Sequence, residues 1–168
     1  GEWYSPTQPI PSAPPPFAKQ GISLNDLVDW TPQIKARALE IASHYHLGGL
    51  YDPPPLINDK LFGALCVPGL QGGINWPGGA VDPVEDVLYV ASENTLYRAQ
   101  VTPGAPGKGV LYHDTRGQQV TPPTTVFGLP LLKPPYGRVT AVDLKTGERL
   151  WMVPHGNTPD NIKRNAKL

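Results

Sequence analysis

The sequence has one cysteine, no net charge and no long apolar run, and each of these shortages excludes a class of protein. A single cysteine, Cys66, excludes a disulfide within the chain. The 14 basic residues balance the 14 acidic ones, which argues against a nucleic-acid-binding or polybasic membrane surface. No run of about 18 apolar residues occurs, so the sequence predicts no membrane-spanning helix. The compartment stays open, because periplasmic proteins can also lack disulfides.

Proline and glycine, in contrast, are abundant, with 22 and 18 copies among 168 residues. This share approaches that of disordered chains. However, four tryptophans, seven tyrosines and 39% hydrophobic residues are more than disordered chains usually carry. We therefore expect an ordered, loop-rich chain of one domain's length, whose short strands and long connections pack onto something larger.

The first 22 residues are expected to form a Pro-rich extended arm. Prolines recur every few positions up to residue 20, which excludes a helix there. A flexible tail or a ligand for a proline-binding module are two interpretations of such a segment. Trp3, Tyr4 and Phe17 favour a third, an arm laid across a surface.

Residues 23–60 are expected to form a helical insertion followed by a loop. A capping-box pattern of Ser23 and Asp26 predicts one short helix, and Thr31 with the proline after it predicts the start of a second. Apolar residues at helical spacing predict a buried face on this second helix: Ile34, Ala38, Ile41 and Tyr45.

The second helix is expected to continue to Gly48 and Gly49, which would end it. His44 and His46 then fall in its last turn. Two residues at this spacing point to different sides of a helix, which disfavours a shared metal ion. Contact with the negatively polarised end of the helix is the better explanation for them.

From residue 61 onward the pattern is typical of β-strands. Residues 61–69 predict one strand, and residues 78–92 predict two strands around a turn at Asp82–Asp86. Residues 137–154 predict another strand pair, in which Asp143 begins the turn and Gly147 takes the left-handed conformation. The sequence Ala-Val-Asp occurs before both turns, with its Asp residues 61 positions apart. This weak internal repeat is consistent with one blade of sheet that carries an insertion.

The remaining polar residues form no recognisable catalytic or metal-binding motif. The sequence has no nucleophile elbow, P-loop, zinc-protease motif or dinucleotide fingerprint. His113 and Asp114 are adjacent, so they would point to opposite faces of a strand. Lys133 is expected to be an exposed loop cation and His155 a loop residue after the last strand. We therefore predict no catalytic residue and no metal ligand in this chain.

The segment AVDLKTGERLW, residues 141–151, resembles the tryptophan-docking motif of the quinoprotein dehydrogenase β-propellers. The matching residues are Ala141, Asp143, Thr146, Gly147 and Trp151. Residues 68–83 resemble the family's Gly-Gly-x-Asn-Trp-x-Gly-Gly segment, and residues from Leu131 on resemble its Pro-Pro-x-Gly segment. The Pro-rich start and the following helix resemble an excursion in membrane-associated glucose-dehydrogenase-like members. The resemblance thus runs over nearly the whole chain, in the family's order.

This resemblance implies a mainly β fold, a partial β-propeller of the eight-bladed quinoprotein type. Residues 61–168 would contribute incomplete propeller blades, two or three by length, beside the Pro-rich arm and the short helical insertion. The docking motif would form a structural girdle between blades. Because a propeller leaves few free sheet edges, the remaining blades or another chain would cover the exposed ones.

The resemblance also implies a function. Members oxidise a sugar or alcohol hydroxyl with pyrroloquinoline quinone (PQQ), usually with Ca²⁺, in the periplasm, and pass the electrons to a quinone acceptor. The family's catalytic aspartate, metal-binding carboxylates and vicinal cysteines have no match here. The isolated chain is therefore expected to be catalytically incomplete and to hold no Ca²⁺ ligand. The alternative is a non-catalytic propeller-like module that binds a partner.

The candidate cofactor-binding residues are Asn75, Trp76 and Gly73. By resemblance, Asn75 matches an asparagine at the quinone site, where its amide could hydrogen-bond the quinone oxygens. Gly73 and the glycine before it would let the backbone approach a planar ligand. The alternative is structural, with Asn75 capping a turn and Trp76 packing between blades. Many members have glycine after the tryptophan, whereas this chain has Pro77.

Overall fold

The computed structural model describes residues 7, 9, 11–49, 52–69, 71–76, 78–107, 112–114 and 124–168, with only the backbone of residues 112–114. Trp3, Tyr4 and Pro77, and the side chains of His113 and Asp114, lie outside this description. The elements, in chain order, are η1 (Leu24–Asp26), α1 (Pro32–Ala42), β1 (His46–Leu47), β2 (Ala64–Cys66), β3 (Gly79–Asp82), β4 (Val87–Glu93), β5 (Tyr97–Ala99), β6 (Val101–Pro103), β7 (Tyr112–Asp114), β8 (Thr125–Val126), β9 (Leu129–Pro130), β10 (Gly137–Asp143), β11 (Arg149–His155) and α2 (Asp160–Lys163).

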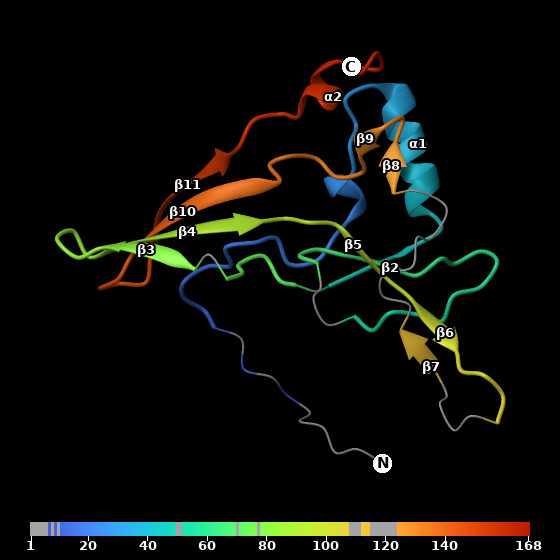
Figure 1. Cartoon of the computed structure of the whole chain (residues 1–168), viewed down its shortest axis with the longest axis horizontal. Coiled ribbons are helices and arrows are strands. Elements are labelled where there is room, and N and C mark those ends of the chain that lie inside the picture. The colour runs from blue at the N-terminus through green and yellow to red at the C-terminus, as the bar shows by residue number, and fades with distance from the viewer. Residues whose placement is uncertain are drawn as a thin grey trace.

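Four strands form the largest sheet, in the spatial order β11-β10-β4-β3, with all neighbours antiparallel. Two hairpins, β3–β4 and β10–β11, lie side by side, and the chain between β4 and β10 leaves the sheet and returns to it (Figure 1). A four-stranded antiparallel sheet is the unit of a propeller blade. Within the described residues the other sheets have only two or three strands. The two Ala-Val-Asp segments lie on β3 and β10, so both belong to this one blade, and the chain between β4 and β10 is a long insertion.

The two hairpin turns have the same geometry, as the repeat predicts. The Oδ1 atoms of Asp82 and Asp143 each accept backbone N–H groups from two and three positions onward, at 2.7–3.2 Å. Four residues after each aspartate the backbone is left-handed, with φ of +55° at Asp86 and +73° at Gly147. The predicted turns and the flanking strands are therefore confirmed, and Asp86 tolerates a conformation that usually favours glycine.

Helix α1 begins where the sequence predicts and ends earlier. Thr31 accepts a hydrogen bond from the backbone N–H of Ile34 at 3.2 Å, and proline occupies the first helical position. The helix stops at Ala42, however, and the next residues form a turn and then strand β1. The expectation that the helix continues to Gly48 and Gly49 is wrong, because parallel pairing of β1 with β2 overrides helical propensity.

The two histidines consequently do not lie in a helical turn. The ring of His44 stacks on Phe62 with centroids 4.9 Å apart, and the Nε2 atom of His46 lies 3.3 Å from Oδ2 of Asp52. The predicted contact of this pair with a helix end is therefore wrong. Each ring is held by a segment that follows the helix in sequence.

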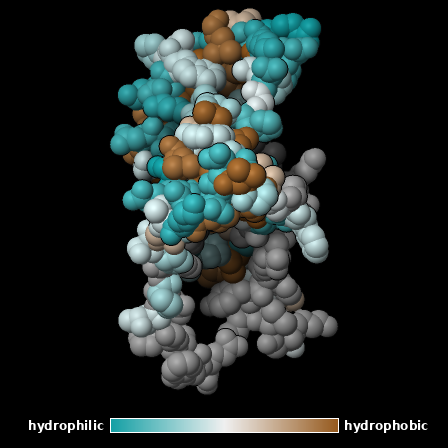
Figure 2. All heavy atoms as spheres, turned by 90° about the vertical axis from the view of Figure 1, so that its left-hand side faces the viewer, coloured by the Kyte–Doolittle hydropathy of each residue, from teal (hydrophilic) through white to brown (hydrophobic). Residues whose placement is uncertain are grey.

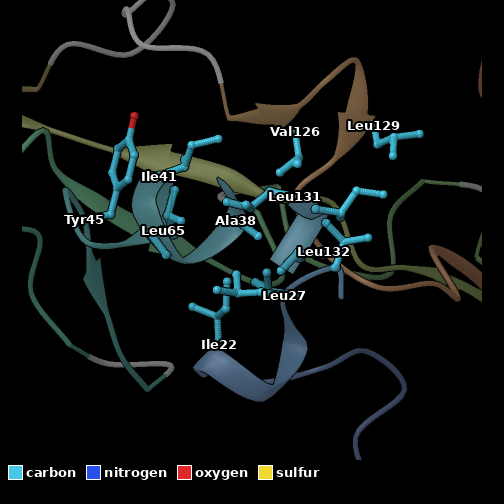
Figure 3. Close-up of a cluster of buried hydrophobic side chains, with 14 residues drawn as sticks. Ile22, Leu27, Ala38, Ile41, Tyr45, Leu65, Val126, Leu129, Leu131 and Leu132 are labelled. Atoms are coloured by element: carbon cyan, nitrogen blue, oxygen red, sulfur yellow. The ribbon is translucent and has the colours of Figure 1, made fainter. Parts of the chain in front are cut away.

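The main hydrophobic core lies between α1 and the insertion of the blade, and not within the blade itself. Side chains of α1 point toward Leu65 from β2 and toward β8, β9 and the residues that follow β9 (Figure 3). Its members are Ile22, Leu27, Val28, Ile34, Ala38, Ile41, Ala42, Tyr45, Leu65, Val67, Val126, Leu129, Leu131 and Leu132. The predicted apolar face is confirmed for Ile34, Ala38 and Ile41 on α1, and Tyr45, which follows the helix, is buried as well, since all four are at most 5% exposed.

The described part of the Pro-rich segment packs along the blade. The Ser92 hydroxyl donates a hydrogen bond to the Phe17 carbonyl at 3.0 Å, and the Lys19 N–H donates to Oδ1 of Asn94 at 2.8 Å. Further along, the Gly21 N–H donates to the Val67 carbonyl at 2.7 Å. Residues 17–21 therefore lie against β4 and the segments next to it, whereas an arm over residues 1–22 stays a prediction. The boundaries expected at residues 22 and 60 stay predictions.

The far end of the blade, where the two turns lie, exposes apolar side chains. Figure 2 looks onto this end and shows brown apolar residues among hydrophilic ones. Val81, Val84, Leu144 and Leu150 are each about half exposed or more, and Trp151 is 43% exposed. Such exposure is typical of a surface that packs against another unit.

Candidate functional site

The candidate site begins with the loop before β3, which runs beside the end of β4. The Glu93 N–H on β4 donates to the Gly73 carbonyl at 2.8 Å, so the loop continues the edge of the sheet beyond β3. The Gly78 N–H donates to the Asn75 carbonyl at 2.9 Å and closes a tight turn. Gly72 and Gly78 have φ of +81° and +64°, which explains the glycines at both ends of the loop. The tip of the loop therefore presents Asn75 and Trp76.

Asn75 uses one side of its amide for the turn and leaves the other available. Its Oδ1 atom accepts a hydrogen bond from the Trp76 N–H at 2.8 Å. This bond fixes the orientation of the amide, so its Nδ2 group points away from the backbone. The Nδ2 group donates no hydrogen bond to any described residue. Trp76 is 97% exposed, so it packs against nothing in the described part of the chain.

Gly73 has a packing reason for its lack of a side chain. A Cβ atom there would overlap Cβ of Ala18 and lie 3.0 Å from the Glu93 carbonyl oxygen. The arm and the end of β4 together therefore require glycine at this position. A role for Gly73 in cofactor binding stays a prediction, but the packing alone accounts for the residue.

A cavity of about 470 Å³ opens beside this loop. Its lining comes from the loop, the end of β4, the start of β10 and the end of β11: Gly73, Asn75, Trp76, Ala91, Ser92, Glu93, Gly137, Arg138 and His155. The volume is in the usual range for ligand pockets. The three predicted cofactor-binding residues thus lie on one wall of a single cavity.

Glu93 and His155, which sequence reasoning did not select, also line this cavity. The prediction that His155 is a loop residue is wrong, because it is the last residue of β11 and pairs with Gly137. Glu93 pairs with the same glycine from the other side. No local pattern in the sequence reveals this grouping, since it depends on the register of three strands.

Two further cavities lie next to the first. One of about 590 Å³ is lined by Trp30, Tyr136, several prolines and His155, and another of about 570 Å³ lies between the insertion and α2. In the first of these, burial raises the pKa of the Tyr136 hydroxyl, which donates a hydrogen bond to the Leu132 carbonyl at 2.9 Å. Tyr136 is therefore a neutral, structural wall of its cavity.

Cys66 and Lys133 have structural environments. Burial raises the pKa of the Cys66 thiol, against a smaller lowering by a hydrogen bond with the Ala99 backbone, so the unreactive thiol form dominates at neutral pH. The Lys133 ammonium lies 2.8 Å from an Asp29 carboxylate oxygen and donates to the Asn25 carbonyl at 3.1 Å. Lys133 therefore ties the blade insertion to the segment before α1 and is not a free loop cation.

The described residues contain no cluster of three or more His, Cys, Asp or Glu side chains that could hold a metal ion. None of the helices in the described ranges has the length and apolar character needed to cross a membrane. The residues with polar side chains in the cavity lining, apart from the indole of Trp76, are Asn75, Ser92, Glu93, Arg138 and His155. Hydrogen bonding to an uncharged or anionic organic ligand is the chemistry that this set supports.

Comparison of the sequence with known proteins identifies the family of the chain. Residues 1–168 match the PQQ family described as glucose/ethanol/alcohol dehydrogenase, beta-propeller domain. A probable quinate dehydrogenase (quinone) of Xanthomonas campestris pv. juglandis is 29% identical over 99% of the chain, and a quinate/shikimate dehydrogenase (quinone) of Acinetobacter baylyi is 30% identical over all of it. Quinoprotein glucose dehydrogenase A of Acinetobacter calcoaceticus is 28% identical over the whole chain.

The chain spans about a fifth of the length of these relatives, 22% in each case. Its fold is mainly β, with a four-stranded sheet and smaller open sheets among the described residues, and is that of an incomplete propeller. The match over every residue agrees with the resemblance drawn from the docking motif and the Gly-Gly-x-Asn-Trp segment. The chain therefore belongs to the quinoprotein dehydrogenase family, as a region of its PQQ β-propeller domain.

Proposed function

We propose that this chain is one region of a PQQ-dependent dehydrogenase that oxidises a sugar or alcohol hydroxyl and delivers the electrons to a quinone acceptor. The family match over the whole chain supports the dehydrogenase class. The observation that carries the site is the Nδ2 group of Asn75, which has no hydrogen-bond partner among the described residues and belongs to the lining of a cavity of ligand size. Because the chain spans only 22% of its relatives, the other blades would supply the rest of the catalytic centre.

The residues of the loop fit a planar quinone. The Nδ2 group of Asn75 would donate a hydrogen bond to a quinone oxygen, where negative charge grows during reduction. The exposed indole of Trp76 would become buried against the ligand or a neighbouring blade. When bound, PQQ supplies the two-electron acceptor that no side chain can provide. Ca²⁺, if the protein uses it, would be held by residues of other blades.

The exposed end of the blade supports a place within a larger propeller. Trp151 is 43% exposed and Val153 is 46% exposed on the same strand, and an adjoining blade would cover them. In this arrangement the segment 141–151 acts as the tryptophan-docking girdle. A periplasmic location follows by resemblance. The alternative function is a non-catalytic propeller-like module, which the same exposed surface would also suit.

A titration of the complete apoprotein with PQQ, in the presence of Ca²⁺, tests the proposal. Tryptophan fluorescence reports binding, and Asn75→Ala is compared with Asn25→Ala, whose side chain is exposed and makes no hydrogen bond in the described structure. We expect saturable quenching that weakens about tenfold in Asn75→Ala, the equivalent of one lost hydrogen bond. Absence of PQQ binding by the folded protein would support the non-catalytic module instead.

A further inference from the structure

The sheet brings Glu93, Gly137 and His155 into one row across β4, β10 and β11. Gly137 is the register partner of Glu93 on one side and of His155 on the other. Directly paired residues of antiparallel strands project their side chains to the same face. The carboxylate and the imidazole therefore rise from one face of the sheet, on either side of a residue that has no side chain.

Gly137 lies between the two polar residues and has no side chain to fill the space between them. A Cβ atom on Gly137 would lie 2.9 Å from the His155 carbonyl oxygen, so the close approach of β11 keeps glycine there. Two strand spacings separate the backbones of Glu93 and His155, which amounts to about 10 Å. A gap of this width holds one six-membered ring with hydroxyl groups at both edges.

Both polar groups lie at the end of the blade, on the last residues of β4 and β11, and are open to a ligand in the described part of the chain. Glu93 and His155 are exposed, and neither side chain makes a hydrogen bond or ion pair with any residue that the structure describes. Arg138, which also lines the cavity, is the register partner of Ser92 and makes no ion pair with Glu93. The Glu93 carboxylate therefore has no ion-pair partner among the described residues.

The chemistry of these walls selects one class of ligand. A carboxylate accepts hydrogen bonds from two neighbouring hydroxyl groups, and an imidazole can donate one and accept another. Trp76, at the rim of the same cavity, offers a flat apolar surface to the C–H face of a ring. The neighbouring cavity of about 590 Å³, lined mainly by prolines and aromatic rings, lacks such a carboxylate.

We propose that Glu93 and His155 are the substrate-recognising walls of this cavity and bind the hydroxyl groups of a cyclic polyol or sugar ring above Gly137. This inference rests on the proposed function, in which Asn75 in the loop before β3 contacts the cofactor. It assigns substrate specificity to two residues that lie in separate hairpins of the blade. The carboxylate of Glu93 contributes acceptors only, and the ring of His155 contributes one donor and one acceptor.

The test uses the complete protein with the variants Glu93→Gln and His155→Gln. Glu85→Gln is the matched control for the first, because Glu85 is exposed in the turn at the opposite end of the same sheet. His46→Gln is the control for the second, because His46 is exposed and lies on β1, outside the blade. Circular dichroism confirms that each variant is folded.

Three quantities are measured for every variant. Calorimetry gives the affinity for D-glucose and for quinate, steady-state kinetics gives KM and kcat for the better of these and for ethanol, and fluorescence titration gives the affinity for PQQ. We expect Glu93→Gln and His155→Gln to weaken binding of the polyol about 10- to 100-fold, the effect of losing hydrogen bonds to a charged or paired polar group. KM for the polyol rises accordingly, while KM for ethanol and the affinity for PQQ change less than about twofold.

The outcomes separate this inference from the proposed function. Unchanged polyol affinity in both variants overturns the inference, even if PQQ binds normally. An equal loss of PQQ affinity in Glu93→Gln and Asn75→Ala also overturns it, because Glu93 would then contact the cofactor. Failure of the wild-type protein to bind PQQ refutes the proposed function. The inference is then still tested by calorimetry, which compares the polyol affinity of the wild type with that of Glu93→Gln and His155→Gln. Failure of the wild-type protein to bind either polyol refutes the inference alone.

Discussion

The indole ring of Trp151 and the phenol ring of Tyr89 lie 5.8 Å apart between centroids, with their planes inclined at 39°. Both residues are register partners of Ala141, which lies between them on β10. Ala141 is fully buried, so the space beneath the two rings holds a methyl group. The three residues therefore form one packed row across the middle of the blade, on the face that exposes Trp151.

Enlarging the middle residue of this row should destabilise the blade. We expect Ala141→Leu to lower the free energy of unfolding by about 1–3 kcal/mol, because the added atoms must displace the two rings. Urea unfolding followed by circular dichroism measures the change. Ala80→Leu is the control, since Ala80 is exposed on the edge strand beside Tyr89, and its effect should stay within about 0.5 kcal/mol. Equal effects of the two substitutions would contradict the packing described here.

The turn between β10 and β11 depends on glycine for its backbone conformation. We expect Gly147→Ala to cost about 1 kcal/mol, because φ at this position is +73°. Space is not the reason, since the nearest atom to a new Cβ, that of Ala13, lies 3.7 Å away. Gly49→Ala serves as the comparison, with an ordinary φ and its nearest neighbour at 3.9 Å. Thermal unfolding that shifts equally in both variants would exclude backbone strain as the cause.

Asn94 joins the arm, the blade and its insertion. Its Oδ1 atom accepts from the Lys19 N–H at 2.8 Å, and its Nδ2 group donates to the Pro135 carbonyl at 3.2 Å. Because Asn94 is only 7% exposed, Asn94→Ala leaves two partly buried groups without this partner and should cost about 1–3 kcal/mol. Hydrogen exchange should accelerate at the Lys19 amide. Protection of that amide equal to that in the Asn25→Ala control would show that the arm does not depend on Asn94.

The ion pair at the base of the arm should make stability depend on pH. Partial burial acts to raise the pKa of the Asp26 carboxyl, but the Lys19 ammonium at 2.6 Å and hydrogen bonds from Ser23 outweigh it and lower this pKa below its ordinary value of 3.8. A lowered folded-state pKa adds stability that is fully present above pH 3.8 and is lost as pH falls through the folded-state value.

We therefore expect Asp26→Asn to be less stable than the wild type at pH 7, and the difference between them to shrink as the pH is lowered below 3.8. Urea midpoints at several pH values measure this difference. Glu85→Gln, which removes an exposed carboxylate with no ion pair among the described residues, should show no such convergence. A gap that stays constant from pH 7 to pH 3 would rule out the charge of Asp26 as its source.

Local chemistry in the sequence was sufficient for several elements. Asp143 and Gly147 predicted the turn between β10 and β11, because an Asx hydrogen bond and a left-handed glycine are properties of a few consecutive residues. Thr31 predicted the start of α1 for the same reason. The end of α1 was not predictable, since it depends on the pairing of β1 with a strand that lies some 18 residues further along.

The candidate site was only partly visible in the sequence. The Gly-Gly-x-Asn-Trp segment identified Asn75 and Trp76 because its residues are contiguous. Glu93 and His155 were missed, since their meeting at Gly137 is a consequence of strand register. The packing reason for Gly73 was missed as well, because its neighbour Ala18 belongs to the arm.

The sequence by itself determined the family, the turns, the capped start of α1 and its buried face, all of which depend on residues a few positions apart. Only the tertiary structure decided that both Ala-Val-Asp segments lie in one blade, and that the main core lies between α1 and the blade insertion. The tertiary structure also decided which polar side chains share a cavity. The physical reason is that turn and cap hydrogen bonds join residues a few positions apart, so the local sequence predicts them. Burial and strand pairing join segments that are distant along the chain, and neither composition nor residue spacing reveals which segments will meet.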